Sequence, residues 1–358
     1  MLHPKAKICF LIPTMKTGGI ETYLLRFLQL YSNKIYPIVI VKSNEKDDLY
    51  NEYKRIGIKI IPKKIGYFNV KNWLRLYGFF RHENFNTVCD MGANFAGIPL
   101  TIARLAGIQK RIAFYRQSTH HFHLTRLKIL YANFVNWLVY LNATTILANS
   151  QYALNFYFRK KIDSRCKVIK NGVNKELFKV NENKEQLRNY FKLPEDKVII
   201  GHTGRVAPAK NHKTIFEVAR KVCNNNANVL FVLAGDNTQD LPKQDGIITL
   251  GYCYEIPKLL KTFDVFYFPS LTEGQPNSLI EAMISGLPFV ASDIAPIKEC
   301  VPESHFSQLI DAADVQASKA KIEEIINSDS KEKYCCRNWA IEEYNAFERF
   351  MQFYKELI

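Results

Sequence analysis

The sequence has 358 residues, 47% of them hydrophobic and 13% aromatic, which is long enough for two domains that each bury a core. No apolar run reaches the roughly 18 residues of a membrane-spanning helix, and the eight Cys form no C-x-x-C pair, which argues against a disulfide framework or a zinc site. Residues 1–170 hold 27 Lys and Arg against 8 Asp and Glu, whereas the remainder holds 22 against 26, so the first half is expected to meet an anionic partner.

The first half alternates short apolar runs with longer amphipathic ones. Helices are expected between several of the runs, at 20–31, 72–80 and 131–141. Strands are expected at 7–12, 36–41, 58–61, 86–91, 111–115, 144–149 and 166–170. This alternation is typical of a parallel sheet covered on both faces. The first run is followed by no small-residue cleavage site, so we expect a cytosolic protein without a signal peptide.

A polar stretch at 171–186 is interpreted as a linker, after which the alternation restarts. Strands and helices are then expected at 197–204, 213–223, 227–236, 246–252, 264–270, 278–285 and 287–293, followed by a helical, aromatic and charged end. We therefore predict an α/β chain with two doubly wound, Rossmann-like domains at 1–170 and 171–330, and a C-terminal helix at 331–358 that packs back towards the first domain. Open parallel sheets bind ligands at the carboxyl ends of their strands, so the active site is expected in a cleft where the two domains face each other.

The stretch EGQPNSLIEAM, which begins at Glu273, places two carboxylates on either side of a predicted helix start. Backbone amides of this turn would point at an anion, and the helix dipole would reinforce them. Glu273 and Glu281 cannot bind a phosphate, but they can accept hydrogen bonds from the vicinal hydroxyls of a ribose or a hexose. A nucleotide-sugar combines both features. Glu281 also has a second interpretation, because Ser278-Leu-Ile-Glu281 fits a capping box that needs no ligand.

With its surroundings, this stretch resembles the E-x7-E signature of retaining glycosyltransferases of family 4, also called glycosyl transferases group 1, which have the two-domain GT-B fold. Other segments resemble the family in the same order, namely PTMKTGGIETYLLRF, VIKNGVNKELF and GHTGRVAPAKNHKTIFEVA. The similarity covers nearly the whole chain and is strongest over 165–295. It implies the transfer of a hexosyl unit from a UDP- or GDP-sugar, as in bacterial surface-polysaccharide glycosyltransferases.

The resemblance also implies roles for individual residues. Arg205 and Lys210 would grip the diphosphate, whose negative charge grows as the glycosidic bond breaks. Glu273 would accept the hydroxyls of the donor sugar, and Glu281 those of the ribose. The other positions implied to bind the donor are glycines, backbone amides and one base-contacting residue: Gly18, Gly19, Gly204, Gly274, Gln275, Pro276, Asn277, Ser278 and Tyr252.

The segment RIAFYRQSTHHFH holds the acceptor-side candidates. Relatives often carry a His at the end of a strand in this region, and His120 is predicted to have that catalytic role, with Arg116, His121 and His123 as alternatives. A front-face displacement needs no enzyme base, because the departing phosphate can accept the proton. The chain contains no Asp-x-Asp, so we expect neither a metal nor any other cofactor.

Two segments of the basic half, KNWLRLYGFFRH and HLTRLKILYANFVNWLVY, mix aromatic side chains with Arg and Lys. Such a mixture can lie in a membrane interface, although it can also form ordinary core. We predict a peripheral enzyme at the cytoplasmic membrane face that acts on a lipid-linked or oligosaccharide acceptor in O-antigen, capsule or lipopolysaccharide assembly. No nucleic-acid partner is expected, since no RNA-binding motif is present. A nucleotide-sugar epimerase of the same fold is the alternative activity.

Overall fold

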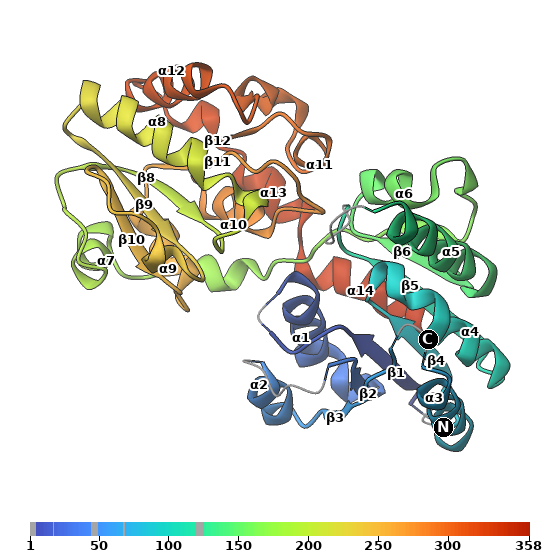
Figure 1. Cartoon of the computed structure of the whole chain (residues 1–358). Helices are drawn as coiled ribbons and strands as arrows, with labels where there is room; N and C mark the ends of the chain where they lie inside the picture. The colour runs from blue at the N-terminus through green and yellow to red at the C-terminus, as the bar shows by residue number, and fades with distance from the viewer. Residues whose placement is uncertain (1–4, 17, 44–48, 67–68, 119–124) are drawn as a thin grey trace. The chain divides into compact units, whose positions relative to one another are not determined.

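A computed structural model describes residues 5–16, 18–43, 49–66, 69–118 and 125–358. Their contacts divide the chain into two compact units, one made of Met1–Asn171 with Glu348–Ile358 and the other of Gly172–Phe347. Figure 1 shows that each unit is a parallel sheet with helices on its faces. The predicted α/β class with two doubly wound domains is therefore confirmed.

The first unit is built on a seven-stranded parallel sheet in the order β3-β2-β1-β4-β5-β6-β7. Its central strands are buried on both faces, which explains why they read as almost continuous apolar runs. The strands are β1 (Lys7–Ile12), β2 (Tyr36–Val41), β3 (Lys59–Pro62), β4 (Thr87–Asp90), β5 (Lys110–Tyr115), β6 (Thr145–Ala148) and β7 (Cys166–Val168).

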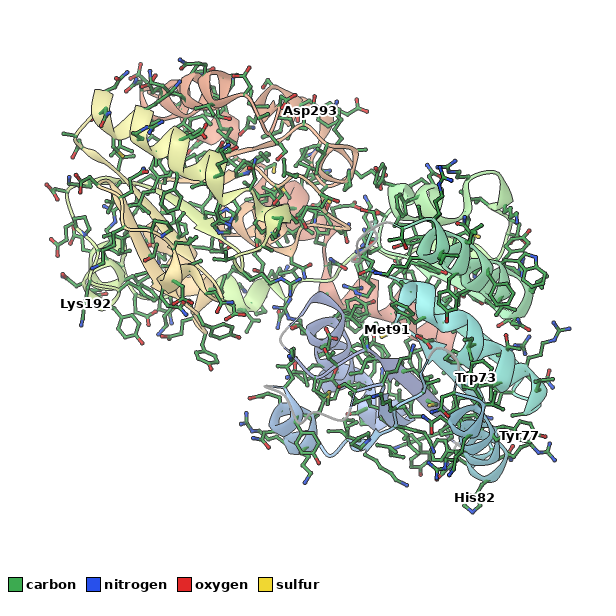
Figure 2. The ribbon with its side chains drawn as sticks, in the orientation of Figure 1. Trp73, Tyr77, His82, Met91, Lys192 and Asp293 are labelled. Atoms are coloured by element: carbon green, nitrogen blue, oxygen red, sulfur yellow. The ribbon has the colours of Figure 1, made fainter. Side chains whose placement is uncertain are left out.

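Helices cover both faces of this sheet (Figure 1). One face carries α3 (Val70–Glu83), α4 (Gly97–Leu105), α5 (Arg126–Asn142) and α6 (Gln151–Phe158), which share one apolar core with the strands. Figure 2 labels Trp73 and Tyr77 on α3. The other face carries α1 (Gly19–Tyr31) and α14 (Ala346–Leu357), whose rings Phe27 and Phe353 lie 4.8 Å apart between centroids. A short helix, α2 (Tyr50–Arg55), precedes β3.

The second unit has a six-stranded parallel sheet in the order β10-β9-β8-β11-β12-β13. The chain starts at β8, adds strands on one side and then returns to add β11 on the other, so the switch point lies between β8 and β11. Ligands of such sheets bind beyond the carboxyl ends of the strands at this point. The strands are β8 (Val198–Thr203), β9 (Val229–Ala234), β10 (Ile247–Gly251), β11 (Val265–Phe268), β12 (Phe289–Ser292) and β13 (Leu309–Ile310). The helices are α7 (Lys184–Tyr190), α8 (His212–Asn225), α9 (Ile256–Thr262), α10 (Asn277–Ser285), α11 (Ala295–Lys298), α12 (Val315–Ile326) and α13 (Arg337–Glu343).

Two expectations about the connecting segments are corrected. The stretch at 171–186 is not a free linker, because Val173 is buried and its N–H donates to the Tyr344 carbonyl oxygen at 2.8 Å. The C-terminal segment does not act as one piece from residue 331. Residues up to 347 pack in the second unit, where Ala340 and Tyr344 join its core, and only the part from Glu348 onward packs in the first.

Candidate active site

Two loops meet at the switch point of the second sheet. One follows β8 and leads through the 3₁₀ turn Pro208–Lys210 into α8, and the other joins β11 to α10. The Leu271 N–H donates to the Ala209 carbonyl oxygen at 2.8 Å, and the Asn211 side-chain amide donates to the Pro269 carbonyl oxygen at 3.2 Å. These bonds fix the two loops against each other, so side chains far apart in sequence meet here.

Lys210 and Glu273 form an ion pair across the two loops. The Lys210 Nζ lies 2.7 Å from Glu273 Oε1, and the side chains are only 18% and 12% exposed. The same ammonium group lies over the Phe268 ring, 4.7 Å from its centroid, which is within cation–π range. Two residues that the sequence placed in separate motifs are therefore direct neighbours.

Arg205 extends from the β8 loop into solvent. Its side chain is exposed, and no residue within the described part of the chain forms an ion pair or hydrogen bond with the guanidinium. The backbone beneath it is held firmly, since the Gly204 N–H donates to the Ala234 carbonyl oxygen at 2.8 Å. Gly235 makes this approach possible: its φ is +142°, and a Cβ there would lie 2.3 Å from the Gly204 carbonyl oxygen. The loop therefore presents an available cation on a fixed backbone.

The helix α10 begins at Asn277, and its N-cap is Pro276, which has no side-chain capping bond. Ser278 is thus the second helical residue and not the cap, so the capping-box interpretation of Glu281 is wrong. The first turn of a helix leaves amide groups without intrahelical partners, and this turn follows directly on Glu273 and Gly274. Pro276 itself has no N–H, so it can shape the turn but cannot donate. The helix ends as predicted at Gly286, with φ of +83°.

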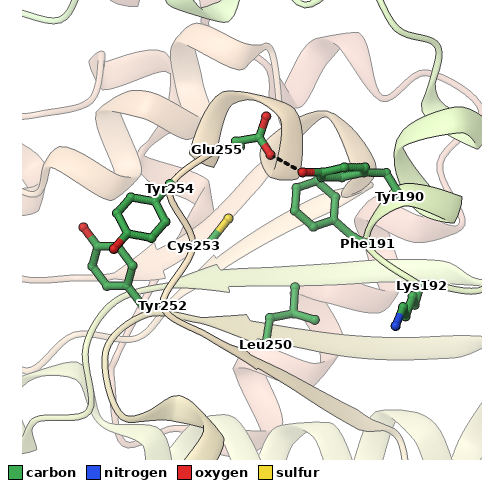
Figure 3. A pocket seen from close by; sticks show the side chains of 8 residues that line it. All are labelled: Tyr190, Phe191, Lys192, Leu250, Tyr252, Cys253, Tyr254 and Glu255. Atoms are coloured by element: carbon green, nitrogen blue, oxygen red, sulfur yellow. Dashed lines mark hydrogen bonds between the residues drawn. The ribbon is translucent and has the colours of Figure 1, made fainter.

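Tyr252 follows β10, two strands away from Lys210. It is 45% exposed, and its ring lies 4.6 Å from that of Tyr254 between centroids. Figure 3 shows these two rings on one side of Cys253, with Tyr190 and Phe191 on the other. Together they line a shallow hollow of about 350 Å³. Tyr252, the predicted base-contacting residue, therefore lies beyond the carboxyl end of β10, at the same edge of the sheet as Lys210, and lines this hollow.

Two histidines beside the β8 loop were missed by the sequence analysis. His202 on β8 is 1% exposed and its Nδ1 lies 3.0 Å from the Tyr267 carbonyl oxygen, while His212 opens α8 and is 8% exposed. The ring centroids are 5.4 Å apart. Burial lowers the pKa of His202 from 6.5 to about 3 and lowers that of His212 as well. Both rings are therefore neutral at pH 7, where they line the loop without adding charge.

The buried ring of His202 makes the second unit sensitive to acid. An unfolded imidazole takes up a proton below its ordinary pKa of 6.5, whereas the folded one resists protonation down to about 3. The folded state therefore loses stability as the pH falls through this window, by about 1.4 kcal/mol per pH unit. We expect His202→Asn to lower this slope in urea unfolding between pH 6.5 and 4 by the share of His202, leaving that of His212, whereas exposed His82→Asn keeps the slope of the wild type. Parallel stability curves for wild type and His202→Asn would contradict the assignment.

In the first unit, Gly18 and Gly19 follow β1 at the start of α1, with Gly18 as the N-cap and Gly19 as the first helical residue. A Cβ on Gly18 would lie 2.6 Å from Glu21 Oε2, so the glycine leaves room for a carboxylate that sequence analysis missed. Glu21 is 6% exposed, accepts a hydrogen bond from Thr14 Oγ1 at 3.1 Å, and has its pKa raised by burial. The sequence feature that could have identified Glu21 is its position two residues after the glycine pair.

Arg116 lies at the carboxyl end of β5 and is 9% exposed. Its guanidinium carbon lies 3.6 Å from the Tyr23 ring centroid, and one Nη donates to Asn171 Oδ1 at 2.6 Å. The Nε and the other Nη find no partner among the described residues. Burial lowers the pKa of Arg116 to about 10, so it keeps its charge at pH 7. His120, His121 and His123 lie outside the described residues, and the role of His120 stays a prediction.

Family models match both units. A model described as Glycosyltransferase Family 4 matches residues 17–177, and one described as Glycosyl transferases group 1 matches residues 183–340. The match of the second model includes Arg205, Lys210, Glu273 and Glu281.

Curated relatives carry glycosyltransferase names. EpsF of Bacillus subtilis (strain 168), named as a glycosyltransferase, is 31% identical over 326 residues, which is 82% of this chain and 80% of EpsF. The Escherichia coli UDP-Gal:alpha-D-GlcNAc-diphosphoundecaprenol alpha-1,3-galactosyltransferase is 25% identical over 97% of this chain and 95% of its own.

A solved structure shares the fold. Anabaena HepE in complex with UDP and glucose superposes with a TM-score of 0.82 at 19% identity, and the alignment covers 98% of this chain and 99% of HepE. With both units matched by family models and a relative at 31% identity over most of its length, the chain belongs to glycosyltransferase family 4 and has the GT-B fold.

Proposed function

We propose that this protein transfers a hexosyl unit from a UDP- or GDP-sugar, with retention of anomeric configuration, to a hydroxyl of a lipid-linked or oligosaccharide acceptor. The observation that carries the proposal is the meeting of the β8 and β11 loops, where Lys210 and Glu273 pair at 2.7 Å beside exposed Arg205. Cations, helix amides and a carboxylate at one switch point suit a diphosphate joined to a sugar.

The charges fit the leaving group of this reaction. As the bond between the anomeric carbon and the phosphate oxygen breaks, negative charge grows on the nucleoside diphosphate. Arg205, Lys210 and the N-terminus of α10 favour that charge more in the transition state than in the bound donor. Glu273 and Glu281 accept hydrogen bonds from the sugar and ribose hydroxyls and so orient the donor.

Retention follows from attack on the same face that the leaving group departs from. The acceptor oxygen forms the new bond to the anomeric carbon, and its proton passes to the departing phosphate oxygen, so no enzyme nucleophile is required. Arg205 and Lys210 supply the positive charge at the diphosphate that a metal ion supplies in other glycosyltransferases, so we propose that the reaction is independent of metal. Adding EDTA should leave the rate unchanged.

The acceptor class is proposed from the relatives. The E. coli relative is named for a GlcNAc-diphosphoundecaprenol acceptor, and a Staphylococcus aureus relative is named for capsular polysaccharide biosynthesis. We extend these to envelope polysaccharide assembly at the cytoplasmic face of the membrane, to which the enzyme would bind peripherally. Across the ranges that the structure describes, no helix is long and apolar enough to cross a bilayer.

A donor and acceptor panel tests the proposal. The purified chain is incubated in detergent with UDP-Glc, UDP-Gal, UDP-GlcNAc or GDP-Man and a sugar-diphosphoprenol, and the product is read by mass and by anomeric proton coupling. We expect a gain of one hexosyl mass and an α-linkage from an α-linked donor. Epimerised donor formed without acceptor would instead identify the alternative, a nucleotide-sugar epimerase, and a β-linkage would overturn retention.

A further inference from the structure

The helix α5 has two apolar sides, of which only one is buried. Ala132, Val135 and Val139 face the core of the first unit. On the opposite side, large apolar residues recur at intervals of three and four and remain in solvent: Leu127 (80% exposed), Leu130 (65%), Phe134 (50%), Trp137 (45%) and Leu141 (46%). At 1.5 Å per residue this exposed stripe is about 21 Å long. Core packing does not account for it.

Neighbouring helices of the same layer extend the stripe. On α3, Val70, Leu74 and Tyr77 are 60%, 66% and 39% exposed and share one side of the helix, and Leu105 at the end of α4 is 70% exposed. Figure 1 shows α3, α4 and α5 along one side of the sheet, and Figure 2 shows Tyr77 on α3. We call the exposed apolar residues of α3, α4 and α5 the outer face.

The outer face lies in strongly basic surroundings. Residues 91–162 contain no Asp or Glu but nine Lys and Arg. On the helices themselves, the exposed cations are Lys71, Arg75, Arg81, Arg104, Arg126 and Lys128. The acid at the end of α3, Glu83, is already paired with Lys7. The layer therefore combines an apolar stripe with uncompensated positive charge.

We propose that the outer face is the docking surface for an anionic lipid bilayer. Apolar side chains would enter the boundary between head groups and acyl chains, while the flanking cations would meet lipid phosphates. A second copy of the chain is disfavoured, because an isologous contact would bring like charges together. This inference rests on the proposed lipid-linked acceptor and adds which surface meets the membrane.

Docking by this face would serve the acceptor side of the enzyme. The helix α5 follows β5, so its first turn lies at the carboxyl edge of the sheet, where Arg116 follows β5 and Gly18 precedes α1. Leu127 and Leu130 belong to this end of the stripe. A bilayer against the outer face would therefore lie beside the edge that carries the acceptor-side candidates, and an acceptor anchored in that bilayer could reach them without leaving it.

Vesicle flotation of the full chain tests the proposal. We expect binding to phosphatidylcholine vesicles that contain phosphatidylglycerol, weak binding to phosphatidylcholine alone, and release at high salt. Leu130→Gln/Trp137→Gln should lower the partition coefficient between vesicles and water at least tenfold, because each change removes an apolar side chain that the bilayer would bury. Arg126→Gln/Lys128→Gln should lower it about fivefold per charge.

Matched variants in the second unit provide the controls. Leu177→Gln/Phe347→Gln removes two exposed apolar residues, and Arg220→Gln/Lys243→Gln removes two exposed cations, so both should leave binding unchanged. In a Trp73→Phe/Trp339→Phe background, the remaining Trp137 should be quenched by brominated acyl chains. Equal loss in control and α5 variants, or no quenching of Trp137, would overturn the docking surface, and equal binding to neutral vesicles would overturn its anionic partner.

Activity separates this inference from the proposed function. In detergent, where no bilayer is needed, the α5 variants should retain the turnover of the wild type. If the α5 variants keep their turnover in detergent and also bind vesicles as well as the wild type, the docking surface is rejected while the proposed function stands. A dimer in light scattering that the α5 variants dissociate, without vesicle binding, would show that the face meets a second copy and would also reject the proposal.

Discussion

Replacing Arg205 with Ala should lower kcat for sugar transfer by about 10²–10³-fold, the loss typical of removing one group that stabilises developing charge. The side chain is exposed, and within the described residues it has no ion-pair or hydrogen-bond partner, so its removal should change the free energy of unfolding by no more than about 0.5 kcal/mol. Turnover with a saturating donor and thermal unfolding measure the two effects separately.

Two further variants make the Arg205 result specific. Arg220→Ala removes an exposed arginine from α8 in the same unit and should leave both quantities unchanged. Arg205→Lys keeps a charge but loses the planar, two-pronged donor, so it should recover only part of the rate. A variant Arg205→Ala with full activity would mean that the cation does not face the donor. A large loss of stability would mean that it supports the loop.

The success of the sequence analysis at the sheets has a physical cause. Parallel strands that are buried on both faces form almost continuous apolar runs, so β1 and β9 could be predicted from their local sequence. The pairing of Lys210 with Glu273 was harder to predict from the sequence, because it depends on β8 and β11 being neighbours in the sheet. The resemblance predicted both residues as donor ligands but not the contact between them.

Other features could not be predicted because they are decided by packing. Ser278 and Glu281 fit a capping box by spacing, but the N-cap is Pro276, two residues before Ser278, and the helix starts at Asn277. His202 is buried by the packing around β8, and this burial, together with nearby His212 and Lys210, lowers its pKa. The segment that contains α5 was left open between core and membrane. Its helix has one buried side and one exposed apolar side, and composition alone cannot separate the two.

Glu273→Gln is expected to lower kcat/KM by about 10²–10³-fold for two reasons that experiment can separate. The carboxylate pairs with Lys210 across the two loops, and the proposed function adds a second role in accepting donor hydroxyls. Loss of the pair leaves the largely buried Lys210 ammonium without its partner, which should cost about 1–3 kcal/mol of stability. Urea unfolding and steady-state kinetics of the same variant give the two quantities.

A double-mutant cycle isolates the pair. Lys210→Met and Glu273→Gln should each destabilise the second unit, and the double variant should be more stable than the sum of the two losses predicts, with a coupling of about 1–3 kcal/mol. Activity should not recover with stability, because the double variant lacks both the cation that we propose for the diphosphate and the carboxylate that we propose for the sugar. Additive stability losses would mean that the ion pair contributes little.

Donor analogues then separate the role of Glu273 towards the sugar from its role towards Lys210. A deoxy donor that lacks the hydroxyl bound by Glu273 should react more slowly than the parent donor with the wild type, since a good hydrogen-bond acceptor loses its partner. With Glu273→Gln, the same pair of donors should react at nearly equal rates, because the charged acceptor is already gone. Suppose instead that, with Glu273→Gln, every deoxy donor is slower than the parent donor by the same factor as with the wild type. Glu273 would then act only by holding Lys210 in place, and the residue that orients the sugar would have to lie elsewhere on the loop before α10.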